Sequence, residues 1–388
     1  MRAPLSRGVT LLFAVACGLA VANAYYAQPL LDTMAAQFCI TRAANGLVIT
    51  ITQIGYGLGL LLLVPLGDRL NRRRLILGQS LLSIVALLGV ALAPNGMALL
   101  IAMGCVGLLA VVTQILVAYA ATLARPEESG AVVGTVTSGI IIGILLARTV
   151  SGTLAALFGW RSVYLASAAA TLMVVIALAR VLPTSEARGS AIPYPRLIAS
   201  LFTLLREERL LRRRAFLALL IFAVMTLLWT PMVLPLSAPP FSLSHTQVGL
   251  FGLAGAMGAV GAASAGRLAD RGHAQKVTGA ALLTMLLSWL AVALLPVSLW
   301  GLIVGVITMD FGLQAAHVAN QSLIYRLRPE ARSRLAAAYM IFYSIGSAMG
   351  SMLSTILYAG FGWSGVCAAG ALVSTIALAF WWATRHDG

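Results

Sequence analysis

Residues 61–75 read LLLVPLGDRLNRRRL, an apolar segment that ends in an Asp-Arg pair and a basic run. Residues 259–273, AVGAASAGRLADRGH, repeat the same element in the second half of the chain. The aspartates of the two copies, Asp68 and Asp270, lie 202 residues apart. This spacing predicts that the chain of 388 residues contains an internal duplication.

Other landmarks keep nearly the same offset. Pro29 and Pro231 are also 202 residues apart, and Gly159 and Gly362 are 203 residues apart. The duplication therefore extends over most of the chain, and its two units are expected to share one structure.

The composition places the chain in a lipid bilayer. Hydrophobic residues make up 60% of the sequence, charged residues 10%, and the mean hydropathy is +0.96. A soluble core cannot enclose that much apolar surface. Apolar stretches long enough to cross a membrane, about 20 residues each, occur near residues 8–31, 43–66, 75–94, 97–124, 130–157, 161–182, 215–236, 246–266, 275–296, 299–323, 335–357 and 364–384.

These stretches predict the fold class. Backbone groups inside hydrocarbon have to bond within their own segment, so each stretch is expected to form a helix. The prediction is an all-α membrane protein with twelve transmembrane helices in two pseudo-symmetric six-helix halves, residues 1–182 and 213–388. A duplicated membrane domain is typical of a transporter, because two similar halves can rock about a central site.

Residues 183–212 differ from both halves and are expected to link them on the cytosolic side. Leu197, Leu201 and Leu204 recur at helical spacing beside several arginines, which suggests a helix lying in the membrane interface. A solvated connector without such a helix is the alternative.

The net charge of +15 would suggest a nucleic-acid partner for a soluble protein, but here the basic residues gather in alternate loops. Arg72, Arg73 and Arg74 follow the second span, whereas the loops on the other side carry only Arg42 and Arg161. The positive-inside rule therefore predicts that both termini lie in the cytosol. The basic runs are interpreted as membrane anchors, and no nucleic acid is expected as a partner.

A cleaved secretory signal is an alternative interpretation of the first apolar stretch. Arg2 and Arg7 precede this stretch, and residues 22–24 imitate a cleavage site. We expect no cleavage, because removal of the first span would leave the seventh span without its counterpart.

The polar residues do not suggest an enzyme. The chain has four cysteines, and they show neither pairing nor metal-ligand spacing. No cluster of histidine, cysteine and carboxylate has metal spacing, and no nucleophile has a visible base. Neither a cofactor nor a metal is predicted.

The Asp-Arg element carries a family resemblance. It resembles the loop 2–3 signature of the major facilitator superfamily, Gly-x-Leu-Ala-Asp-Arg-x-Gly-Arg-Arg, although Val64 and Asn71 replace both glycines. The matching residues of the first copy are Leu66, Asp68, Arg69, Arg72 and Arg73. The second copy, residues 266–271, fits better. The resemblance covers essentially the whole chain and implies the twelve-helix fold of that family.

The resemblance also implies a gate at the cytosolic side. Each aspartate would brace the start of a helix in the opposite half, near Ser333 for Asp68 and near Ser129 for Asp270. A carboxylate at a helix N-terminus meets the positive end of the helix dipole. The same predicted gate includes Arg69, Arg72 and Arg271.

Within the superfamily, residues 25–31 (YYAQPLL) and 55–59 (GYGLG) are similar to bacterial exporters of the drug, sugar and purine-nucleoside type. The resemblance implies proton antiport and a place in the bacterial inner membrane. Two motifs of such exporters differ here. The fourth span has Gln114 but no arginine, and residues 147–152 read ARTVSG where the exporters often have Gly-Pro-x-x-Gly-Gly.

Arg148 is a charged residue inside the fifth span. A charge near the bilayer centre costs at least ~2.5 kcal/mol on insertion scales, so Arg148 is expected to face a polar cavity and to have a partner. Among the acidic residues only Asp32 and Asp310 do not map to the cytosolic side. Asp310 matches the depth of Arg148 within ~3 Å, whereas Asp32 lies near the outer end of the first span. The sequence therefore predicts a central charge pair of Arg148 and Asp310 across the halves.

The tenth span carries a polar stripe. Asp310, Gln314, His317 and Gln321 share one helix face, because they are spaced i, i+4, i+7 and i+11. This face is expected to line a wet substrate cavity, and a buried structural network is the alternative. In the repeat, His317 aligns with Gln114, so both halves would present a polar group at one depth. Further lining is predicted from Tyr25, Tyr26, Gln28, Gln53, Tyr56 and Trp229.

The sequence thus predicts a secondary active transporter that exports a small organic molecule in exchange for protons by alternating access. Asp310 is the predicted titrating group, because a carboxylate held away from water binds a proton more readily and releases it when Arg148 approaches. One alternative is a symporter that imports a sugar-like or other small metabolite. Another is a receptor or scaffold that transports nothing. The expected partners are the lipid bilayer, protons and a small-molecule substrate, and the protein is expected to be monomeric.

Overall fold

The computed structural model describes residues 6–38, 46–123, 129–183, 193–254, 271–325, 327–328 and 332–385, together with 258, 261, 264–265 and 268. Every regular element within these residues is a helix. Nine helices of this part of the chain are long and apolar enough to cross a membrane. The shorter α1, the region of α12 and a second span within α16 complete the predicted pattern. The all-α membrane fold is therefore confirmed.

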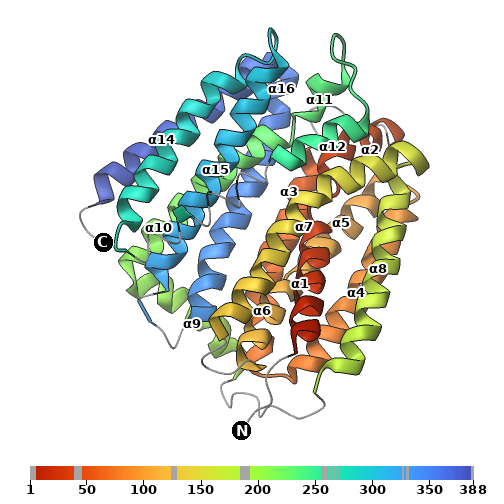
Figure 1. Ribbon diagram of the computed structural model, residues 1–388, viewed down its shortest axis with the longest axis vertical. Coiled ribbons are helices and arrows are strands. Elements are labelled where there is room, and N and C mark those ends of the chain that lie inside the picture. Colours follow the sequence, from red (N-terminus) through yellow and green to blue (C-terminus); the bar gives the residue numbers. More distant parts are fainter. Residues whose placement is uncertain are drawn as a thin grey trace.

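The helices follow one another along the chain as α1 (Arg7–Ala22), η1 (Gln28–Leu30), α2 (Leu31–Phe38), α3 (Gly46–Leu62), η3 (Val64–Asp68), α4 (Arg72–Ala91), α5 (Gly96–Ala110), α6 (Val112–Leu123), α7 (Ser129–Phe158), α8 (Trp160–Val181), α9 (Tyr194–Glu207), α10 (Arg209–Trp229), α11 (Val233–Ser237), α12 (His245–Ala254), α14 (Ala274–Val292), α15 (Leu299–Ile324) and α16 (Arg332–Thr384). Figure 1 shows the first half, red to yellow-green, beside the second half, green to blue. The end of the bundle where α1, α4 and α10 begin carries many arginines, and we call it the basic end.

Polar residues fix where several helices begin. The side chains of Asn71 and Asn95 accept hydrogen bonds from the backbone N–H groups of Arg74 (3.2 Å) and Ala98 (2.9 Å) at the starts of α4 and α5. These N–H groups have no partner within the helix, so an asparagine cap satisfies a donor that would otherwise be lost.

Two glycines mark the same place in the two halves. Gly159 separates α7 from α8 with φ of 81°, and Gly362 divides α16 with φ of 65°. A side chain would be strained in this left-handed conformation, which explains why both copies of the turn use glycine. The offset of 203 residues between them therefore reflects equivalent turns.

The first and seventh spans are not the continuous helices predicted from hydropathy. α1 ends at Ala22 and is followed by a turn, while α10 ends at Trp229. Pro231 lies two residues beyond the end of α10, where its missing backbone N–H interrupts the helical hydrogen bonds, and Pro29 lies within η1, after the turn that follows α1. The fourth predicted span is also divided, into α5 and α6.

The halves meet at the end opposite the basic end. The hydroxyl of Ser351 in α16 donates to the carbonyl of Gly46 in α3 (3.0 Å), and Thr149 of α7 donates to the carbonyl of Gly249 in α12 (2.9 Å). Gly249 has no side chain, which lets α12 lie directly against the backbone of α7 at Arg148. In Figure 1 this closed end lies near α2, α11 and α12, away from the N-terminus.

The helix α9 lies within the predicted linker and contacts both halves. Its buried leucines Leu197, Leu201 and Leu204 form one face, as the helical spacing predicts. At its start, the hydroxyl of Tyr194 donates to the carbonyl of Leu62 at the end of α3 (2.6 Å). At its other end, Glu207 and Glu208 accept hydrogen bonds from Arg328 at 2.9 and 2.7 Å. Arg328 lies in the connection between α15 and α16.

Candidate substrate cavity

A cavity of about 380 Å³ lies between the two halves. Its walls come from α1, α3, α6 and α7 of the first half and from α10, α15 and α16 of the second. Its lining runs along α7 from Arg148 back to Thr137, and along α15 from Asp310 to Gln321. Each run covers 12 residues, about 16 Å of helix from first to last, and leads toward the basic end. The cavity therefore begins at the closed contacts and extends toward the basic end.

Arg148 lies at the closed end of the cavity and is 4% exposed. Its Nε donates a hydrogen bond to Oε1 of Gln28 (2.7 Å). Its guanidinium carbon lies 3.7 Å from the ring centre of Trp229 and 5.4 Å from that of Tyr25. The electron-rich faces of the rings stabilise the cation in a site with little water.

Asp310 of α15 is 6% exposed and accepts a hydrogen bond from Nε1 of Trp229 (3.1 Å). The ion pairs within 4.0 Å among the described residues are those of Arg328, so Arg148 and Asp310 share this site without direct contact, and their role as a coupled charge pair stays a prediction. Trp229 joins the two charges instead. The indole presents its negative face to the cation and its polar N–H to the carboxylate.

The broken helices explain how these groups meet. Gln28 follows the turn after α1, directly before Pro29, and Trp229 is the last residue of α10, two before Pro231. The side chain that accepts the hydrogen bond of Arg148 and the ring closest to its guanidinium thus lie next to the matched prolines. Gln28 belongs to the first half and Trp229 to the second, so both halves build the site.

The predicted stripe of α15 does line the cavity. Gln314, His317 and Gln321 face it together with Asp310. The imidazole Nδ1 of His317 lies 3.1 Å from the hydroxyl of Tyr339 in α16. On the other side, Gln114 lines the cavity and donates to the hydroxyl of Tyr56 (3.4 Å).

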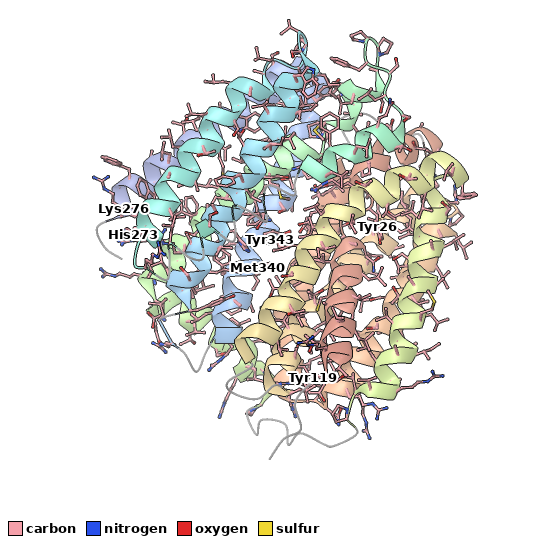
Figure 2. The ribbon with its side chains drawn as sticks, viewed as in Figure 1. Tyr26, Tyr119, His273, Lys276, Met340 and Tyr343 are labelled. Carbon is pink, nitrogen blue, oxygen red and sulfur yellow. The ribbon has the colours of Figure 1, made fainter. Side chains whose placement is uncertain are left out.

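Aromatic side chains from both halves meet in the wall of the cavity. The hydroxyls of Tyr25 and Tyr343 are 2.6 Å apart and hydrogen bonded across the interface. The rings of Tyr56 and Phe222 contact Tyr343 with centres 6.0 and 4.0 Å away. Figure 2 shows Tyr343 and Met340 of α16 at the space between the halves. Of the remaining predicted lining residues, Gln53 faces the cavity, while Gln28 and Trp229 lie behind it as ligands of the charged groups.

The sequence analysis missed Tyr343. A signal was present, because polar residues recur at every fourth position of this span and so occupy one helix face. These residues are all buried: Tyr339, Tyr343, Ser347, Ser351 and Thr355. The serines are small enough to pass for packing residues, which hid the stripe.

Tyr26 does not line the cavity, contrary to the prediction. It borders a separate apolar groove between α1 and α7, and its ring packs edge-on against Tyr164 of α8 with centres 6.4 Å apart. Adjacent residues of a turn point in different directions, so Tyr25 and Tyr26 cannot both reach one cavity. Figure 2 labels Tyr26 among the helices of the first half.

The predicted gate is described only in part. Asp270 and the side chain of Asp68 lie outside the described residues. Arg69 and Arg271 are exposed, and Arg72 donates hydrogen bonds to the carbonyl of Gly67 (3.1 Å) and the hydroxyl of Thr122 (3.0 Å). The described parts of the two helices expected to receive the aspartates, α7 and α16, start at Ser129 and Arg332. The residues before them lie outside the described residues, so the contact with the aspartates stays a prediction.

No group of three or more histidine, cysteine or acidic residues in the described part of the chain could hold a metal ion. The chemistry available in the cavity is therefore that of one guanidinium, one carboxylate, one imidazole, and amide and phenol groups.

Comparison with known proteins gives related transporters. The sequence model of the Major Facilitator Superfamily matches residues 12–288 and 238–388. The chain is 45% identical over 382 residues to the uncharacterized transporter YgaY of Escherichia coli O157:H7, covering 98% of this chain and 97% of that protein. It is 26% identical over 355 residues to the inner membrane transport protein YnfM of Escherichia coli K12, covering 91% and 85%.

One solved structure has a similar arrangement of helices. It is a bacterial homolog to the human lysosomal transporter Spinster, in an inward-facing and unoccupied conformation. The TM-score is 0.81, and the match covers 98% of this chain and 96% of that chain at 16% identity. At this identity the similarity concerns the fold alone.

Proposed function

Because the chain belongs to the Major Facilitator Superfamily of membrane transporters, we propose that it is a proton-coupled antiporter that exports a small organic molecule by alternating access. The observation that carries this proposal is the position of the charges. Asp310 and Arg148 lie on opposite halves, at the closed end of a cavity that both halves build.

Asp310 is the proposed proton carrier. A nearly buried carboxylate is stable as an ion only while a positive charge or hydrogen-bond donors face it. Its partners here are the indole of Trp229, in the same half, and the nearby guanidinium of Arg148 in the other half, so the distance to Arg148 would change when the halves rock. Each half-cycle can therefore alternate between the protonated and the ionised carboxylate.

The proposed orientation has the basic end in the cytosol of a bacterial cell, with both termini on that side of the inner membrane. It rests on the positive-inside rule, since the starts of α4 and α10 carry Arg72, Arg73, Arg74 and Arg209. The cavity then extends toward the cytosol, as an exporter requires when it takes up its substrate.

We also propose that Asp68 and Asp270, with Arg69, Arg72 and Arg271, form the cytosolic gate. The support is their equivalent place in the two halves, where a carboxylate could meet the N-terminal end of a helix of the opposite half. Asp68→Asn and Asp270→Asn should each reduce transport with normal membrane insertion. Unchanged transport in both variants would remove these residues from the mechanism.

The experiment uses purified full-length protein in proteoliposomes that enclose a pH-sensitive dye. Nucleosides, sugars, amino acids and cationic drugs are added outside one by one. An antiporter that carries a compound inward moves protons outward, so the lumen becomes more alkaline. The direction does not depend on how the protein is inserted.

The alternatives give different signals. A symporter would make the lumen more acidic, and a receptor or scaffold would leave the pH unchanged with every compound. Asp310→Asn should abolish the pH change, and full proton movement in this variant would contradict the assignment of Asp310 as proton carrier.

A further inference from the structure

The charges at the closed end of the cavity select a class of substrate. Among the described residues that line the cavity, one permanent cation, Arg148, and one carboxylate, Asp310, face it. They lie in one site without forming an ion pair, since the indole of Trp229 stands between them. Each charge therefore has capacity left for a ligand.

This capacity can be followed atom by atom. Among the described residues, the guanidinium of Arg148 donates a hydrogen bond from Nε to Gln28, and the carboxylate of Asp310 accepts one at Oδ1 from Trp229. Some side-chain nitrogen and oxygen atoms in this part of the chain are fully buried and have no hydrogen-bond partner. This set does not include Nη1 and Nη2 of Arg148 or Oδ2 of Asp310. They therefore retain access to the cavity. Two donors and one acceptor, of opposite charge, face one space.

A ligand with a single charge would pair with only one of these two charged groups and leave the other without a counter-ion. Leaving a buried charge unpaired is costly. A molecule with one ammonium and one carboxylate group answers both, because the ammonium can bind Asp310 and the carboxylate can make a two-pronged contact with Arg148.

The rest of the cavity is suited to an apolar body. Ile144 and Ile140 line it 4 and 8 residues before Arg148, about 6 and 12 Å along α7. Val318 lines it at a similar depth on α15, 8 residues past Asp310. The first aliphatic side chain of α7 thus lies about 6 Å along the helix from Arg148, toward the basic end.

We propose that the cavity binds an α-amino acid with an apolar or aromatic side chain, its charged head at Arg148 and Asp310 and its side chain toward the basic end. This substrate class rests on the proposed function and adds to it. The ammonium group and the coupling proton would compete for the same carboxylate, which gives antiport a physical cause.

The test measures binding to the full-length protein in detergent, by the rise in thermal stability that a ligand of the folded state produces. The probes are leucine, phenylalanine and tryptophan, the amide of each, which lacks the carboxylate, and the N-acetyl form of each, which lacks the ammonium. We expect at least one free amino acid to bind, with both of its derivatives weaker by about tenfold or more.

Two variants assign the groups, and both are measured as ratios so that a loss of overall stability does not matter. Arg148→Gln should remove the preference for the amino acid over its amide, and Asp310→Asn should remove the preference over the N-acetyl form. Arg161→Gln is the matched control, because Arg161 also stacks on a tryptophan, Trp160, but lies outside the cavity. It should keep both preferences.

The proposal is overturned if no free amino acid of the three binds, or if an amide or N-acetyl form binds as well as its parent in the wild type. Proteoliposome measurements keep this result separate from the proposed function. Binding of the amino acid without proton movement would contradict antiport and leave the substrate class standing. Proton movement driven equally by the amide would contradict the substrate class and leave antiport standing.

Discussion

Two places in the described part of the chain hold the same trio of side chains, an arginine stacked on a tryptophan and hydrogen bonded to a glutamine. In the cavity the trio is Arg148, Trp229 and Gln28, with 3.7 Å from guanidinium to ring and 2.7 Å to the amide oxygen. Outside the cavity, at the start of α8, it is Arg161, Trp160 and Gln37, with 4.5 and 2.6 Å.

The difference lies in where the tryptophan N–H points. Trp160 donates to Gln37 (2.8 Å), the same oxygen that receives Arg161, and a second nitrogen of Arg161 donates to the carbonyl of Ala93 (3.2 Å). That trio is complete in itself, and Arg161 is only partly buried. Trp229 instead donates to Asp310 and links its arginine to the other half's carboxylate. One arrangement supports structure, and the other leaves charges available for a ligand.

The largest effect should separate the two arginines. Arg148→Gln leaves Asp310 without its nearby cation, and losing one partner of a buried charged contact costs about 3 kcal/mol, roughly a hundredfold. Arg161→Gln removes a partly exposed contact worth about 1 kcal/mol or less. Proton-coupled flux in proteoliposomes measures both. Equal losses in the two variants would show that the trios do not differ in function.

A second test removes both charges of the cavity. Arg148→Gln/Asp310→Asn leaves no unpaired charge, so its thermal stability should exceed that of Arg148→Gln, with an interaction energy of about 1 to 3 kcal/mol for groups in one network. Transport should stay lost, because the proton carrier is absent. Strictly additive stability losses would mean that Trp229 does not couple the two groups.

The tryptophans can be compared by removing only their N–H. Trp229→Phe keeps an aromatic ring under Arg148 but deletes a hydrogen bond to a charged group, which should cost about 1.5 to 3 kcal/mol in the folded protein. Trp160→Phe deletes a hydrogen bond to a neutral amide, worth about 0.5 to 1.5 kcal/mol. Thermal unfolding in detergent gives both values. A larger loss for Trp160→Phe would reverse the comparison.

The smallest effect concerns salt. The Debye length is about 3 Å at 1 M salt, so interactions of exposed charges are screened and those of buried charges much less. The stability difference between Arg161→Gln and wild type should shrink by a few tenths of a kcal/mol on going from 0.1 M to 1 M salt, as expected for a surface contact. The difference for Arg148→Gln should persist. A salt-sensitive defect at Arg148 would indicate that the cavity is open to ions.

The comparison also shows which features of the site could be predicted from the sequence. The duplication and the depth argument brought Arg148 and Asp310 to one cavity, because both depend on counting residues along helices of known rise. The role of Trp229 could not be predicted, because the indole contacts two charged groups on two other helices, α7 and α15. Hydropathy locates a span but does not tell which side chains of other spans one of its residues contacts.

The direction of individual side chains could not be predicted from the sequence either. Tyr25 and Tyr26 are neighbours of the same type, and only the turn after Ala22 decides that one faces the cavity and the other a groove on the first half. Tyr343 was missed because its stripe is made mostly of small residues, whereas the stripe of α15 carries amides, an imidazole and a carboxylate.

The helix α9 has a mechanical consequence for the cycle. Its 14 residues form a rigid rod about 21 Å long, fixed at Tyr194 to the first half and at Glu207 and Glu208 to the second. When the basic end closes, its two anchor points approach, but a rod cannot shorten. α9 is followed directly by α10 of the second half, whereas the hydrogen bond of Tyr194 ties its start to the first half, so under the proposed alternating access the rod should detach at Tyr194 and travel with the second half. α9 would then hold the halves apart while the cavity faces the basic end and release them when that end closes.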